Sequence, residues 1–103
     1  MTLFVRRLEK TGTLVSRSDS RQLHSGYVVL EQGKEVGEHT TEDEEELVVL
    51  LEGKAEVISN GHAETVEAPC MVLVPPHTVH NVKNKSKGLL KYVYVLPMAT
   101  ALE

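Results

Sequence analysis

Two histidines and one glutamate, His39, Glu46 and His80, form a sensible ligand set for a metal ion. A neutral imidazole and a carboxylate are common protein ligands of divalent transition metals. Two imidazoles and one carboxylate on one face of an ion leave the opposite positions open, as in the non-haem Fe(II) sites that bind O₂ and substrate together. The residue types therefore indicate one divalent transition metal, and Fe, Mn, Ni, Co and Zn would all be accepted.

These residues lie in two clusters that the fold must bring together. The first cluster contains Gly33, His39, Glu46 and Gly53, and the second surrounds His80. A loop of about 35 residues closes at modest entropic cost, so the two clusters can converge even though a hairpin separates them. A small β-barrel would allow this convergence.

The spacing resembles the two sequence motifs of the cupin family. The first motif corresponds to GKEVGEHTTEDEEELVVLLEG, residues 33–53, which matches at Gly33, His39, Glu46 and Gly53. The second corresponds to PCMVLVPPHTVHNVKN, residues 69–84, which matches at Pro75, His80 and Asn84. The resemblance implies an all-β fold, a cupin-type β-barrel or double-stranded β-helix with a jelly-roll-like sandwich. It also implies a single cupin domain over residues 1–103, with a hairpin at 54–68 between the motifs, and a metal site of His39, Glu46 and His80.

Three positions depart from the cupin pattern: Thr41 replaces the second histidine of the first motif, and Pro69 and His77 replace glycines of the second. By the period of a strand, Thr41 is expected to point with His39 into the barrel and to hold a metal-bound water by a hydrogen bond. The alternative is a decayed site that binds no metal. His77 could be a replacement ligand, but a turn residue with positive φ is the preferred interpretation.

The remaining polar and reactive side chains have simpler interpretations. His62 directly follows the Asn60-Gly61 turn and is expected to be exposed, His24 has no partner in register, and the acidic run 42–45 reads as a solvated loop. Cys70 is expected to be a small buried apolar residue at the start of a strand. Three aromatic residues could line a pocket or fill the core: Tyr27, Tyr92 and Tyr94.

Short apolar stretches separated by turn signals predict strands throughout the chain. The dipeptide Asn60-Gly61 predicts a type I′ hairpin turn, because both central positions of that turn need positive φ. The segment 41–53 also fits a helix, since it has capping-box spacing and an acidic first turn. Its β-like neighbours and the cupin resemblance favour a strand. The predicted strands are 3–8, 13–16, 27–32, 47–52, 55–59, 64–67, 71–75, 80–84 and 89–96.

The strand that follows the acidic run is apolar on both faces. If Glu46 faces the interior, Val48 and Leu50 lie on the same side. Leu47, Val49 and Leu51 then face outwards, although they are equally apolar. Such a face needs a covering layer, and we expect a partner subunit to supply it in a homodimer.

Composition narrows the classes of partner. The chain has 103 residues, a net charge of −4 and 41% hydrophobic residues, typical of one globular domain. A nucleic-acid partner is not expected, because phosphate binding needs clustered Lys and Arg. The sequence shows neither an apolar run of membrane-spanning length nor a secretory signal. The lone Cys70 fits a reducing compartment, so we expect a cytoplasmic protein.

The expected function is to bind or convert a small polar molecule at the metal. The resemblance allows dioxygenase, isomerase or lyase chemistry, and a fold does not choose among them. No catalytic residue is assigned, because the sequence shows no general base beyond the ligands. The alternative is a non-catalytic small-molecule-binding or sensor cupin with a weakened or empty metal site.

Overall fold

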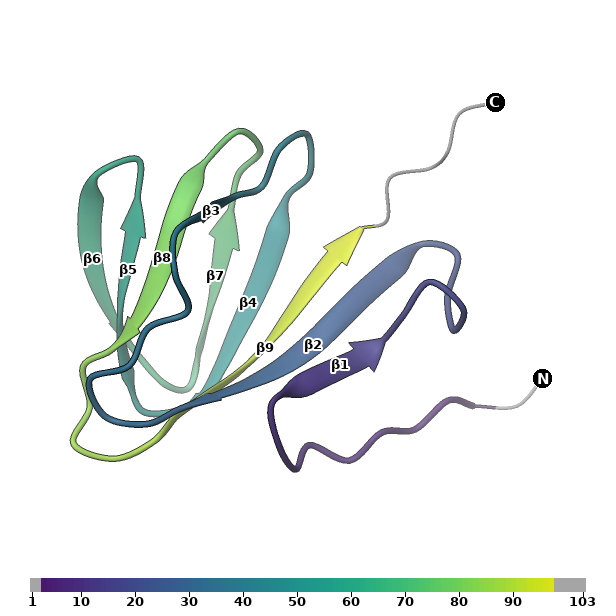
Figure 1. Cartoon of the computed structure of the whole chain (residues 1–103), viewed down its shortest axis with the longest axis horizontal. Helices are drawn as coiled ribbons and strands as arrows, with labels where there is room; N and C mark the ends of the chain where they lie inside the picture. The colour runs from purple at the N-terminus through teal and green to yellow at the C-terminus, as the bar shows by residue number, and fades with distance from the viewer. Residues whose placement is uncertain (1–2, 98–103) are drawn as a thin grey trace.

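The computed structural model describes residues 3–97, in which every regular element is a β-strand. The strands form two antiparallel sheets that face each other (Figure 1). The five-stranded sheet has the order β1-β2-β9-β4-β7, with the bounds β1 Gly12–Val15, β2 Leu23–Leu30, β9 Leu90–Pro97, β4 Glu46–Glu52 and β7 Cys70–Val74. The four-stranded sheet has the order β3-β8-β5-β6, with the bounds β3 His39–Thr40, β8 Val79–Asn84, β5 Lys54–Ser59 and β6 His62–Glu67. This architecture confirms the predicted double-stranded β-helix.

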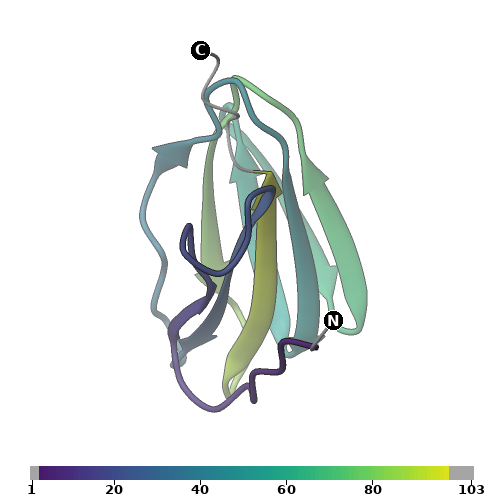
Figure 2. The ribbon, with the colours of Figure 1, turned by 90° about the vertical axis from the view of Figure 1, so that its right-hand side faces the viewer.

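The prediction of a strand at 3–8 is wrong. Residues 3–9 have no regular structure, and in both views they run outside β1 (Figure 1 and Figure 2). Leu3 and Val5 are 85% and 79% exposed. Strand-forming side chains stabilise a strand chiefly through cross-strand neighbours, and β1 pairs only with β2 among the described residues. The other predicted strands are present, although β2 begins four residues earlier than expected, at Leu23.

The segment from Glu46 to Glu52 is a strand and not a helix. Its backbone pairs with β7 on one side and with β9 on the other, which supplies the hydrogen bonds that a helix would have made internally.

In residues 3–97, no helix is long and apolar enough to span a membrane.

The turn at Asn60-Gly61 confirms the predicted hairpin. Ser59 pairs with His62 across the turn, and Asn60 and Gly61 have φ angles of 48° and 85°. Both positive values are those of a type I′ turn, whose twist matches that of the flanking strands. The turn fixes the register of β5 and β6.

Strand β4 has the predicted inward face. Glu46, Val48 and Leu50 are buried, whereas Leu47 and Val49 are half-buried and Leu51 is exposed. The outer face continues onto β7, because Leu47 and Val49 pair with Leu73 and Met71, which are 52% and 56% exposed. The outer face of the five-stranded sheet therefore carries an apolar patch at β4 and β7.

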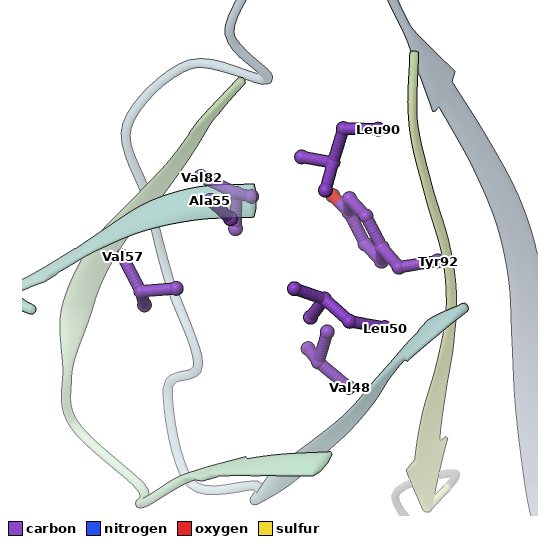
Figure 3. Close-up of a cluster of buried hydrophobic side chains, with 7 residues drawn as sticks. All are labelled: Val48, Leu50, Ala55, Val57, Val82, Leu90 and Tyr92. Carbon is purple, nitrogen blue, oxygen red and sulfur yellow. The ribbon is translucent and has the colours of Figure 1, made fainter. Parts of the chain in front are cut away.

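The apolar core lies between the two sheets at one end of the sandwich (Figure 3). Leu50 and Leu90 are fully buried, and full burial of a leucine side chain contributes about 1.5–3 kcal/mol to stability. Gly53 lies between β4 and β5 and has a φ of 96°, a left-handed conformation that favours glycine. An added Cβ at this position would lie 2.6 Å from the Leu89 carbonyl oxygen. The core comprises Val48, Leu50, Ala55, Val57, Val82, Leu90 and Tyr92.

Candidate metal centre

The structure brings the three predicted ligands together at the other end of the sandwich. His39 on β3 is the cross-strand partner of His80 on β8, so their rings lie side by side with centroids 4.0 Å apart. Glu46, at the start of β4 in the opposite sheet, completes the cluster. Its Oε1 lies 2.9 Å from His80 Nε2 and 3.9 Å from His39 Nε2. One ligand atom from each residue lies within 4.8 Å of the others.

Both imidazoles are oriented by backbone carbonyls. His39 Nδ1 lies 2.9 Å from the Gly37 oxygen, and His80 Nδ1 lies 3.2 Å from the Thr78 oxygen. An Nδ1–H that donates to a carbonyl leaves Nε2 free to bind a metal, which is the usual support of a metal-ligating histidine. The donor set and its orientation therefore fit a divalent transition metal.

Asn81 holds the backbone that precedes His39. Its Oδ1 accepts a hydrogen bond of 2.8 Å from the Gly37 N–H, and its Nδ2 donates one of 2.9 Å to Glu35 Oε1. Gly37 in turn accepts from the His39 ring, so Asn81 positions His39 through one intermediate residue. Sequence reasoning missed Asn81, because its partners are more than 40 residues away.

Hydrogen bonding within the cluster raises the pKa of His80. His80 and Glu46 are 2% and 7% exposed, whereas His39 is exposed. The hydrogen bond to Glu46 raises the pKa of His80, and the bond to Thr78 adds to this, while burial acts in the opposite direction. A proton on His80 would therefore compete with a metal for this side chain.

The hydroxyl of Thr41 makes two hydrogen bonds within the protein. It donates a hydrogen bond of 2.7 Å to the Pro75 carbonyl and accepts one of 3.0 Å from the Thr78 N–H. The single hydroxyl proton is thus used within the protein, so Thr41 could interact with a metal-bound water only as a hydrogen-bond acceptor. Thr41 lines the cavity beside the three ligands, and its predicted hydrogen bond to such a water stays a prediction. Thr41 also ties this segment to the loop that precedes β8.

His77 and His62 lie apart from the site. His77 has a φ of 54° and is exposed, and its Nε2 lies 3.4 Å from Asp43 Oδ1, which confirms that it is a turn residue. His62 is exposed beyond the Asn60-Gly61 turn, as predicted.

A cavity of about 590 Å³ adjoins the three ligands. Tyr92 and Tyr94 line this cavity, so the face of β9 that carries them points inwards. Burial raises the pKa of both phenols, and the Glu46 carboxylate adds to the effect, so both hydroxyls stay protonated near neutral pH. Tyr27 lies on the opposite face of the sheet and is also buried.

Sequence reasoning missed two cavity residues. His24 lines the cavity and packs edge-on against Tyr94, with ring centroids 5.9 Å apart. The signal was the alternation of His24, Gly26 and Val28, which the predicted start of β2 at residue 27 cut off. Glu44 also lines the cavity and is half-buried, unlike its exposed neighbours in the acidic run. Cys70 is half-buried against the core.

Solved structures from several organisms share this fold. The chain is 23% identical to a Cupin 2 conserved barrel domain protein of Salinispora arenicola, with a TM-score of 0.78 over 96% of this chain and 92% of that one. It is 21% identical to a predicted oxalate decarboxylase of Thermotoga maritima (TM-score 0.79, 86% and 79% covered). It is 20% identical to the Cnp3 cupin domain of Schizosaccharomyces pombe, with a TM-score of 0.78. That match covers 87% of this chain and 64% of that one.

Sequence comparison identifies the family. No curated protein sequence gives a significant match. The family model described as a cupin domain matches residues 26–96, which include both clusters, all three candidate ligands and the strands that carry them. The chain therefore belongs to the cupin family.

Proposed function

We propose that His39, Glu46 and His80 hold one divalent transition metal, and that the protein binds or converts a small polar molecule at this site. The convergence of two imidazole Nε2 atoms on one buried carboxylate, at the wall of a cavity, carries this proposal. When bound, the metal would supply Lewis acidity or activate O₂ or water. The chain holds the ligands in place through Gly37 and Thr78 and shields Glu46 and His80 from water.

Oxygen uptake tests the catalytic form of the proposal. Protein loaded with Fe(II) is mixed with a panel of small catechol and carbonyl compounds, and O₂ consumption is measured with and without each compound. Uptake that depends on both the compound and His80 supports dioxygenase chemistry. Isomerase and lyase activity are followed by NMR of the same mixtures. The metal itself, Fe, Mn, Ni, Co or Zn, is identified by elemental analysis of protein purified without a metal-affinity tag.

A non-catalytic binding or sensor protein is the second candidate. The observation that favours it is the engagement of Thr41, the position of the family's further histidine, with the backbone of Pro75 and Thr78. The tyrosine hydroxyls in the cavity also stay protonated and cannot act as bases. A tightly bound metal without turnover of any compound in the panel would decide for this candidate.

The apolar patch at β4 and β7 supports the proposal of a homodimer. A second copy that covers Leu51, Met71 and Leu73 would remove these exposed side chains from water. Sedimentation at micromolar concentration measures the oligomeric state. We further propose that residues 1–103 act as one cupin domain, in the cytoplasm and without a nucleic-acid partner.

A further inference from the structure

The walls of the cavity differ in chemistry. The metal cluster occupies one side, and β2 and β9 of the five-stranded sheet contribute the other. From these two strands, Val28 and Leu96 present aliphatic surface, and Tyr94 and His24 present ring surface. Pockets of this kind bind the body of a ligand by apolar contact and orient it with a few polar groups.

Carboxylates determine the charge of the cavity. Glu38 and Glu44 line it in addition to Glu46. A divalent metal would exceed the charge of Glu46 by one, and Glu38 and Glu44 would more than offset this excess. Among its lining residues within 3–97, none is Lys or Arg, and residues 98–103 (MATALE) contain neither. Glu38 is exposed and Glu44 is half-buried, so a negative group remote from the metal would lose part of its hydration and would have no Lys or Arg to pair with.

We propose that the cavity selects a ligand that presents an oxygen donor to the metal and an uncharged, largely apolar body to β2 and β9. The inference rests on the proposed function, because the donor end is placed at His39, Glu46 and His80. A cavity of about 590 Å³ has room for a single-ring compound. The Tyr94 hydroxyl, which stays protonated, is a neutral hydrogen-bond partner for such a ligand.

Gly26 keeps the Tyr94 ring in its place in this wall. The two residues are cross-strand partners, and a Cβ added at Gly26 would collide with the Tyr94 ring, including its hydroxyl. Gly26 is thus a positioning residue for the wall of the cavity, without contact to the metal cluster. Gly88 offers a matched control, because an added Cβ there meets no atom within 4 Å.

Two catechols of equal shape test the selection of charge. Protein loaded with Zn(II) is titrated at pH 8, where a free imidazole is uncharged, with 3,4-dihydroxybenzamide and with 3,4-dihydroxybenzoate. The metal-binding ends of the two probes are the same, and the far ends differ in charge. We expect the benzoate to bind about tenfold more weakly or worse.

A variant with a new cation provides the gain-of-function test. Val36 lines the cavity, so Val36→Lys is expected to narrow or reverse the preference, whereas the uncharged Val36→Met leaves it unchanged. Equal affinity of the wild type for both probes would overturn the inference. Zn(II)-loaded protein that binds neither probe would also overturn it while the metal site stands. Protein that takes up no Zn(II) would instead refute the proposed function itself.

The Gly26 variants locate the ligand body. Gly26→Ala should weaken benzamide binding several-fold and leave Zn(II) affinity unchanged, and Gly88→Ala should change neither. Tyr94→Phe keeps the ring and should retain most of the affinity for the benzamide. It gives a second test of this wall if the Gly26→Ala chain fails to fold. Benzamide affinity that is the same in Gly26→Ala as in the wild type would show that the body does not lie against Tyr94.

Discussion

The two ends of the sandwich are built from the same strands but have opposite chemistry. On β4, Glu46 enters the metal cluster, and Val48 and Leu50 enter the core two and four residues later. On β8, His80 lies in the cluster and Val82 in the core. Strand alternation puts all of these side chains on inward faces, so position along the strand decides their environment. The comparison indicates that one part of these strands contributes the apolar core and the other part contributes the candidate metal ligands.

The largest effect is expected from removal of one ligand. His80→Ala should lower metal affinity by about 100-fold or more, because a lost ligand should cost at least as much as the loss of an outer-shell partner. His62→Ala is the matched control, since His62 is exposed beyond the hairpin turn. Calorimetric titration with Ni(II) measures both. Equal affinity in the two variants would contradict the assignment of the site.

A core substitution should have the opposite profile. Leu50→Ala removes a fully buried side chain and should lower the free energy of unfolding by about 2–5 kcal/mol. Metal affinity of the remaining folded protein should change little. Urea unfolding and Ni(II) titration separate the two quantities. If Leu50→Ala greatly lowers metal affinity without lowering stability, the division between a stabilising core and a metal-binding cluster is contradicted.

Thr41 should contribute to stability more than to metal binding. Thr41→Val keeps the shape but leaves the Thr78 N–H and the Pro75 carbonyl without a partner, which should cost about 1–3 kcal/mol. Ni(II) affinity should fall by less than in His80→Ala. If stability is unchanged and only metal affinity falls, Thr41 acts at the metal after all.

The smallest effect is expected in the pH dependence of two quantities: the stability of the metal-free protein and the affinity for a metal. The two should change with pH in opposite directions. The pKa of His80 is raised in the folded protein, so without metal its contribution to stability is full below about 6.5 and is lost as pH rises through the raised pKa. Metal binding displaces this proton, so metal affinity should instead rise with pH over the same window. Thermal unfolding with and without Zn(II) measures both trends, and His80→Gln should lose the first.

The sequence was sufficient where spacing or turn chemistry is local. The cupin motifs, the Asn60-Gly61 turn and the alternation of Glu46, Val48 and Leu50 all depend on residues close in the chain. The prediction of a strand at 3–8 was wrong because strand propensity alone does not determine whether a segment pairs with a neighbouring strand. The roles of Thr41 and Asn81 were missed because their partners, Pro75 and Gly37, lie more than 30 residues away.

The metal content of the untagged protein tests the central claim most directly. Wild-type protein and Glu46→Gln, purified without a metal-affinity tag, are compared by elemental analysis after dialysis against Zn(II). Glutamine keeps the size of the side chain but removes the carboxylate charge that the two imidazole Nε2 atoms face. The account predicts about one equivalent of metal per wild-type chain and a large loss in the variant. Equal metal content in the two proteins would contradict it.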